Sequence, residues 1–358
     1  ARTAGFPNDL VQTLNAATIA ESAFSNGSEW SILSYFARLE YNYDEKYLFS
    51  VSGRTDGSSR FAKNTKWGYF PSASLGWIVS KENFFGEGNV INFLKLRGSY
   101  GSNGNFDIGN YEHIALLDSE NYVFGSEENI VNGLTKGNLS NDKLTWETTT
   151  SWDLGLNISF LNNKFELEAD YYDAISKDFL FNVPLEPHTG FESFRENRGE
   201  IKNSGIEIAL TYHEKIGNLE ITANANFSKN KNEVLELGPE GNRIITSGAV
   251  SDATYVTQIG DPIGSYFLYV EDGVFANQAE VDAVPHFAGA RPGDIRYVDT
   301  DGDGDIDSED RQIVGNYNPD YLLGGSLNLK YKNFDLGISV NSSQGSEILN
   351  LNRRFTAN

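Results

Sequence analysis

The sequence of 358 residues has no cysteine, no methionine and only four histidines. Without cysteine, the chain has no disulfide bonds, thiolate metal ligands or cysteine nucleophiles. Basic residues are also scarce, because 28 Lys and Arg stand against 50 Asp and Glu, which gives a formal net charge of −22. A nucleic-acid partner is therefore not expected, since neutralising phosphates requires a basic surface.

Long apolar runs are missing as well. No stretch approaches the roughly 18 consecutive apolar residues of a transmembrane helix, which excludes a helical membrane protein. A membrane β-barrel stays open, because its strands alternate apolar and polar residues. The aromatic content of 13% argues against disorder. The chain starts at Ala1 without methionine and stops at Asn358 in a predicted loop, so we expect a fragment of a longer protein.

Alternation of apolar and polar residues is what the sequence does have. In 152–160, every even position is large and apolar and every odd position is small or polar. Because side chains of a strand point alternately to its two faces, this pattern predicts a half-buried strand. About ten such strands are expected, around 35–43, 47–51, 73–79, 94–100, 152–160, 165–171, 205–212, 219–228, 326–331 and 334–341. A short helix is predicted at 7–14.

The connections between these strands alternate in length. Short ones fall at 44–45, 161–163, 214–217 and 332–333, a medium one at 81–93, and long ones at 57–66, 101–143, 179–199 and 231–319. Outer-membrane barrels have short periplasmic turns and long external loops, so the pattern predicts an all-β, antiparallel, up-and-down transmembrane barrel. A soluble sandwich with a second sheet over the apolar face is the alternative. Aromatic residues beside the short turns favour an interfacial girdle, although cross-strand packing would also place them there.

One acidic segment stands out at 299–310. It fits the start of a calcium-binding loop, with carboxylates at positions 1, 3, 5, 9 and 12, glycine at position 6 and the backbone carbonyl of Asp305 at position 7. The candidate calcium ligands are Asp299, Asp301, Asp303, Asp305, Asp307 and Asp310. Asp310 departs from the template, which has a longer Glu there. A solvated acidic turn is the alternative, and a bound Ca²⁺ is expected to stiffen an external loop.

Catalytic motifs are not found. His113, His188, His213 and His286 are scattered, without the paired spacing of a zinc hydrolase, and no nucleophile elbow or phosphate-binding glycine loop is present. Carboxylate pairs are expected by chance in so acidic a chain. An enzyme is therefore not predicted.

Several motifs together resemble a known family. They are 34–41 (SYFARLEY), 52–61 (SGRTDGSSRF), 67–72 (WGYFPS), 94–101 (LKLRGSYG), 144–148 (LTWET), 197–201 (NRGEI) and 292–296 (PGDIR). In this order they resemble the barrel of SusC/RagA-type TonB-dependent transporters, and the resemblance covers essentially the whole chain.

The resemblance implies an outer-membrane importer of Bacteroidetes-type bacteria, built as a plugged barrel of about 22 strands. It implies uptake of oligosaccharides or peptides, a SusD-like surface lipoprotein as a lid, and energy from TonB–ExbB–ExbD acting through a plug. Residues 1–358 would form a barrel segment without the plug or the final strands, and 231–319 an external loop that contains 299–310. A calcium-stabilised surface adhesin or structural β-protein without transport is the second hypothesis.

The resemblance also suggests which residues meet the cargo. Polar residues on the lumen face are candidates for contact with solute, or for hydrating the lumen and pairing with the plug: Asp153, Asn157, Glu166, Glu168, Glu207, Glu220, Asn224 and Asn226. Loop aromatics are candidates for stacking on sugar rings or packing against the lid: Phe191, Phe194, Tyr255 and Tyr266. The choice between glycan and peptide stays open, while the net charge disfavours polyanionic cargo.

Overall fold

The computed structural model describes residues 3–4, 19–20, 27–86, 90–124, 129–191, 193–237, 243–247 and 254–350. The helix predicted at 7–14 lies outside these residues. Within them, no helix has the length and apolar character that crossing a membrane requires.

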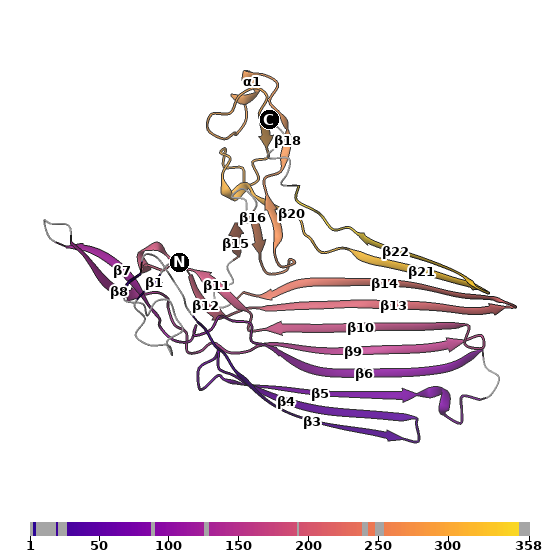
Figure 1. Ribbon diagram of the computed structural model, residues 1–358. Coiled ribbons are helices and arrows are strands. Elements are labelled where there is room, and N and C mark those ends of the chain that lie inside the picture. Colours follow the sequence, from indigo (N-terminus) through magenta and orange to yellow (C-terminus); the bar gives the residue numbers. More distant parts are fainter. Residues whose placement is uncertain are drawn as a thin grey trace.

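Ten strands form one antiparallel sheet (Figure 1). Strands that follow one another among these ten are also neighbours in the sheet, in the order β22-β21-β14-β13-β10-β9-β6-β5-β4-β3. Their bounds are β3 Ile32–Tyr43, β4 Tyr47–Ser58, β5 Trp67–Ile78, β6 Ile91–Asn105, β9 Glu147–Phe160, β10 Phe165–Lys177, β13 Glu200–Ile216, β14 Leu219–Glu236, β21 Tyr321–Tyr331 and β22 Phe334–Gln344. The predicted up-and-down arrangement is confirmed.

The connections at the two ends of the strands differ as predicted. The end with the tight turns is called the turn edge and the other the long-loop edge. Tight turns at one edge use the left-handed backbone region, for example at Asp44 (φ 53°), Asn162 (φ 60°) and Lys332 (φ 53°). The β5–β6 connection at this edge contains a short 3₁₀ helix, η2 (Val79–Lys81). At the other edge the connections carry hairpins, β7 (Leu117–Phe124) with β8 (Asn129–Lys136) and β11 (Leu180–Pro184) with β12 (Ser193–Asn197). The long connections therefore contain secondary structure at this end of the sheet.

The segment predicted as one long loop, 231–319, differs from the expectation in two ways. Strand β14 continues past 231 to Glu236, because it keeps pairing with β13 after its apolar alternation ends. The described part of the remainder contains a small sheet of β15 (Ile244–Ser247), β16 (Thr254–Thr257), β17 (Ser265–Leu268) and β20 (Gln312–Gly315). A second pair, β18 (Glu271–Val274) with β19 (Ile295–Tyr297), and two short helices, α1 (Gln278–Val281) and η4 (Ser308–Asp310), complete it.

One face of the ten-stranded sheet is apolar and uncovered. Leu154 is 58% exposed, Leu336 is 53% exposed and Val340 is 62% exposed. In the described part of the chain, no second layer packs on the row that contains Leu154, Leu156 and Ile158. This observation excludes the soluble sandwich and matches the lipid-facing side of a membrane barrel.

Aromatic side chains border this face at both ends. On the turn side, neighbouring rings meet at Phe160–Phe165 (5.2 Å between centroids) and Phe165–Tyr212 (4.8 Å). Toward the long loops a second row follows. It contains the ring pairs Trp152–Tyr171 (5.3 Å between centroids) and Phe227–Tyr321 from adjacent strands, and Tyr35–Trp67, which lie on β3 and β5 with β4 between them. From 152 to 160 an extended strand spans about 26 Å, similar to the ~25 Å apolar band of outer-membrane barrels. The sequence predicted the turn-side girdle only.

The buried cores lie at the long-loop edge. Phe61, Phe70, Ile108, Leu144 and Trp146 form one cluster, in which Leu144 is fully buried. The indole N–H of Trp146 donates to the carbonyl of Lys66 (3.0 Å), so this cluster also fixes the β4–β5 connection. Backbone hydrogen bonds between the strands therefore hold the sheet together, whereas apolar packing holds the structure at the long-loop edge.

A charge placed on the apolar face should destabilise the barrel. Ala223 lies in the middle of the row that runs from Leu219 to Phe227 on β14. Ala223→Arg is expected to lower the free energy of unfolding of the barrel by about 2–4 kcal/mol, because the guanidinium would enter the bilayer interior. Urea unfolding in lipid vesicles measures it.

Asn226→Arg is the matched control, since Asn226 lies on the same strand and faces the other side of the sheet. Its effect should stay within about 0.5 kcal/mol. Equal losses from both variants would contradict the assignment of the two faces.

Candidate functional site

The polar face of the sheet forms the wall of the lumen. The eight predicted lumen residues share it, as the strand register requires: Asn157 lies opposite Glu168, which lies opposite Ala209, which lies opposite Asn226. Some of these side chains have partners in the wall. Asn224 donates to the hydroxyl of Thr211 (2.9 Å), and Glu220 pairs with Lys215 (2.6 Å). Contact of the eight residues with solute stays a prediction.

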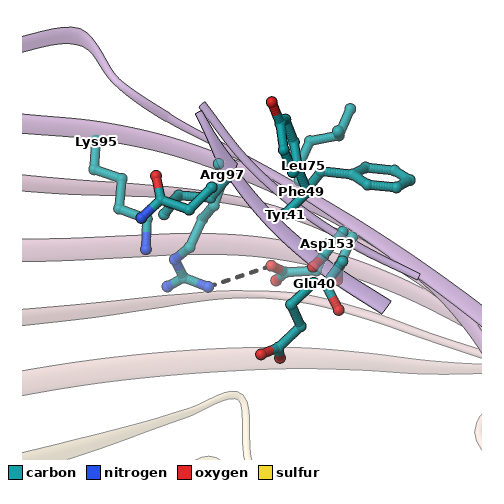
Figure 2. A pocket seen from close by; sticks show the side chains of 14 residues that line it. Glu40, Tyr41, Phe49, Leu75, Lys95, Arg97 and Asp153 are labelled. Atoms are coloured by element: carbon teal, nitrogen blue, oxygen red, sulfur yellow. Dashed lines mark hydrogen bonds and ion pairs between the residues drawn. The ribbon is translucent and has the colours of Figure 1, made fainter. Parts of the chain in front are cut away.

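Arg97 on β6 is the centre of a charged cluster on this face, and Figure 2 shows its contact with Asp153. Its guanidinium lies 2.6 Å from a carboxylate oxygen of Asp170, 2.8 Å from Glu168 and 3.4 Å from Asp153. It also donates to the side-chain carbonyl of Asn157 (3.2 Å). One cation therefore joins three neighbouring strands, β6, β9 and β10.

Gly155 makes this arrangement possible. It lies on β9 directly between the strands that carry Arg97 and Asp170. A Cβ at Gly155 would lie 2.5 Å from Cζ of Arg97 and 2.4 Å from Oδ1 of Asp170. The side chain of Arg97 thus reaches across β9 through the space that a glycine leaves open.

Negative charge exceeds positive charge in the cluster. One oxygen of Asp170, Oδ1, is buried and accepts no hydrogen bond within the described chain. Next to the cluster, a hollow of about 410 Å³ is lined by Glu168, Asp170, Glu207, Asn226 and Ser228, among others. This part of the wall repels anions and favours neutral or cationic groups.

A second hollow, of about 480 Å³, lies beside Arg97 between β3 and β6. Its polar lining includes Glu40, Lys95 and the small residues Ser50, Ser74 and Ser99. Figure 2 shows Arg97 and Asp153 on one side of the strands, and Tyr41, Phe49 and Leu75 on the other. The small serine side chains leave space for this hollow on the lumen face.

The acidic loop brings three of its six predicted calcium ligands together. Oxygen atoms of Asp299, Asp301 and Asp303 lie within 4.8 Å of one another. The backbone N–H groups of Gly302 and Gly304 donate to the carboxylate of Asp299 (2.7 and 3.1 Å). Both glycines have left-handed φ angles, 76° and 92°, which the tight loop needs.

The other three aspartates are not in this group. Asp307 accepts from the backbone N–H of Glu309 (2.7 Å) and caps η4. Asp310 is 1% exposed and accepts from the backbone N–H groups of Thr300 (2.6 Å) and Asp307 (2.8 Å). Asp305 accepts from its neighbour Ile306 (3.2 Å). Asp310 therefore joins the two ends of the loop.

These positions have opposite electrostatic consequences. Hydrogen bonds from backbone N–H groups lower the pKa of Asp310, and the one from Asp307 has the largest effect. Its stabilising contribution is therefore present at neutral pH and is lost only as the pH falls through that lowered pKa. For Asp301, a hydrogen bond from the backbone of Asp303 lowers the pKa, but desolvation and the charges of Asp303, Asp310 and Asp299 outweigh it and raise the pKa. The negative charges of its neighbours therefore disfavour the ionised form of Asp301.

The predicted loop aromatics are partly used for packing. Tyr255 and Tyr266 lie against each other across β16 and β17, with ring centroids 5.7 Å apart, and the hydroxyl of Tyr266 donates to the carbonyl of Glu347 (3.1 Å). Phe191 and Phe194 are half-buried. Sequence reasoning identified the lumen face but missed Arg97 and Asp170 as a site. The signal available was a lone Arg on a polar strand face, with a glycine on a neighbouring strand.

Removing the positive charge at Arg97 should weaken the wall. In Arg97→Gln the carboxylates of Asp153, Glu168 and Asp170 lose their shared partner. Because these groups are partly exposed, the expected loss is about 1–2 kcal/mol in the free energy of unfolding of the barrel. Urea unfolding in lipid vesicles measures it, and Lys95→Gln, a charge removed from the same strand and face, is the control.

The same measurement on Asp170→Asn and on the double variant tests the coupling. Asp170→Asn should cost less in the Arg97→Gln background than in the natural protein, because the repulsion is then relieved. Strict additivity of the two changes would contradict the proposed cluster.

Comparison with known proteins assigns the chain to a family. Residues 3–351 match the family described as TonB dependent receptor-like, beta-barrel. TonB-dependent receptor P3 of Formosa agariphila is 37% identical over 94% of this chain and 34% of its own length. TonB-dependent receptor SusC of Bacteroides thetaiotaomicron is 32% identical over 87% of this chain and 31% of its own length.

Solved structures agree with this placement. The RagAB peptide importer in its closed-closed state superposes with a TM-score of 0.78 and 26% identity, over 99% of this chain and 38% of the other. The chain thus spans about a third of the length of the relatives it matches. It belongs to the TonB-dependent receptor family and corresponds to part of the outer-membrane β-barrel of a SusC/RagA-like member.

Proposed function

We propose that the chain forms part of the wall of a SusC-like outer-membrane importer that takes up peptides or oligosaccharides. The observation that carries the proposal is the similarity to SusC and to the RagAB peptide importer along almost the whole chain. An apolar face toward lipid and a charged face toward an enclosed lumen are what an importer wall requires. The family is one of receptors and transporters, and we propose no enzymatic activity.

The partners follow from the same proposal. A SusD-like surface lipoprotein would close the external mouth, and TonB with ExbB and ExbD would supply energy through a plug. The elaborated long-loop edge supports the first point, because folded loop structures such as the β7–β8 hairpin and the β15–β20 segment offer a broad surface beside the mouth.

The wall suggests which cargo is accepted. Three carboxylates, Glu168, Asp170 and Glu207, line one hollow. Arg97 pairs with Glu168 and Asp170, whereas Glu207 has no ion pair among the described residues. A polyanion would be repelled by this surface, whereas a neutral glycan or a peptide with basic side chains would not. We therefore propose neutral or cationic oligomers as substrates.

The alternative, a calcium-stabilised adhesin, is disfavoured by the uncovered apolar face. An adhesin without transport needs no lipid-facing band, yet large apolar side chains such as Leu154 and Ile338 are at least half exposed.

Uptake by the native cell tests the importer. Deletion of the receptor gene should abolish growth on the cognate oligomers and uptake of their labelled forms, with growth on their monomers retained. Purification from detergent-solubilised outer membrane should yield the receptor together with a surface lipoprotein. Recovery in a soluble fraction, or unchanged uptake of peptides and glycans alike, would refute the proposal.

We further propose that Asp299, Asp301 and Asp303 bind Ca²⁺ with the backbone carbonyl of Asp305. A hard cation bound by oxygen ligands would relieve the repulsion that raises the pKa of Asp301. Its role would be to hold an external loop rigid. Asp307 and Asp310 would support the loop through the hydrogen bonds that they already make.

Calorimetric titration of the chelator-treated full-length receptor with Ca²⁺ tests the site. Asp299→Asn with Asp303→Asn should abolish binding, whereas Asp305→Asn should retain it, because that residue would contribute its main chain. Affinity should fall as the pH is lowered toward the raised pKa of Asp301, where protons compete with the ion. Equal binding by the double variant and the natural protein would exclude the site.

A further inference from the structure

Four polar side chains on the lumen face lie next to a glycine of the neighbouring strand. The register places each side chain directly opposite its glycine, and the glycine belongs to the strand that follows in the sheet. The pairs are Arg97–Gly155, Tyr172–Gly205, Asn226–Gly324 and Asn328–Gly337. The same arrangement therefore recurs along the wall from β6 to β22.

These side chains occupy the space that a Cβ atom would need at the glycine. In the order of the four pairs, the facing side chain would lie 2.5, 2.6, 2.4 and 3.2 Å from such a Cβ atom. Non-bonded carbon atoms prefer separations of roughly 3.5–4.0 Å, so the first three distances exclude a Cβ atom and the fourth requires the amide to move. Each side chain therefore lies flat across its glycine instead of extending into the lumen.

Partners beyond the glycine hold the two longest of these side chains against the wall. Arg97 crosses β9 and reaches Asp170 on β10 (2.6 Å). Tyr172 crosses β13 in the same way, and its hydroxyl donates to the side-chain carbonyl of Asn230 on β14 (2.9 Å). Both contacts join strands that are two apart in the sheet. They depend on a residue without a side chain on the strand between.

Glycines on the outward face of the ten described strands have different surroundings. At Gly57, Gly98 and Gly104 the nearest side chains are apolar. At Gly53 and Gly325 a Cβ atom would meet no side chain within 4 Å. Polar side chains that lie over glycines are therefore a property of the lumen face.

The arrangement leaves open space on that face. Asp170 turns toward Gly155, where a Cβ atom would lie 2.4 Å from its Oδ1, and Asn226 turns toward Gly324. Both side chains thus turn away from β13, which lies between their strands. The hollow of about 410 Å³ that they line together with Ala209 lies between them.

We propose that the glycines at 155, 205, 324 and 337 determine how bulky an oligomer can pass along this wall. The inference rests on the importer function proposed above. A methyl group at one of these positions would force the facing side chain off the wall, either into the lumen or into the hollow. Slender oligomers would still pass, whereas oligomers with a large cross-section would meet the displaced side chain.

Uptake of mixed oligomers by cells tests the proposal. A receptor-deletion strain that carries the natural receptor or a variant is given a casein digest or a mixture of linear and branched dextrins, and mass spectrometry follows their loss from the medium. Gly324→Ala should lower the uptake of peptides with bulky side chains, or of branched dextrins, roughly fivefold relative to the slender members of the same mixture. Asn226→Ala in the Gly324→Ala background should restore the ratio, because the shorter side chain no longer needs the space over residue 324.

Gly325→Ala is the matched control, because Gly325 faces the other side of the same strand and a Cβ atom there would meet only a backbone oxygen, at 3.6 Å. Its ratio of bulky to slender uptake should equal that of the natural receptor. The same ratio in Gly324→Ala, or an equal loss with and without the Asn226→Ala change, would overturn the role of the glycines and leave the importer standing. Failure of the natural receptor to take up either mixture would refute the importer and the inference with it. If Gly324→Ala does not reach the outer membrane, Gly337→Ala decides the question.

Discussion

The structure depends on the pairing of every strand's backbone with a neighbour while the side chains are separated by the pleat. In a bilayer interior no water satisfies an N–H or C=O group, so only a hydrogen-bonded wall is stable there. Once the strands are paired, the pleat directs successive side chains alternately to the lipid and to the lumen. This is why the described residues form no buried core on the sheet between the ends of its strands, and why the clusters around Trp146 and around Val234 lie at the long-loop edge.

Much of this architecture could be predicted because alternation is a local property. Ten strands and the alternation of short and long connections follow from residues that are neighbours in sequence. The extension of β14 to Glu236 could not be predicted this way. Its last residues pair with β13, but their sequence does not alternate between apolar and polar residues. The aromatic row from Tyr35 to Tyr321 was missed for a similar reason. Its members are far apart in sequence, and only the register brings them to one height.

The candidate sites divide along the same line. The acidic loop is visible in the sequence because its ligands are spaced within one segment. The structure adds that the aspartates differ in role, since Asp299 and its two neighbours converge whereas Asp310 is buried and closes the loop. The cluster at Arg97 was not predicted. Its carboxylates come from strands that follow β6 only after a long connection, so their proximity depends on which strands are neighbours and in what register.

Arg97 has a consequence for how the strands find their alignment. A shift of one strand by two residues keeps every apolar side chain toward lipid. The burial of apolar side chains therefore distinguishes poorly between such registers. The guanidinium meets Asp153, Glu168 and Asp170 at one alignment of β6, β9 and β10, and the missing side chain at Gly155 leaves a passage at that level alone. The contacts of this one arginine thereby select one strand register among several that bury the apolar residues equally well.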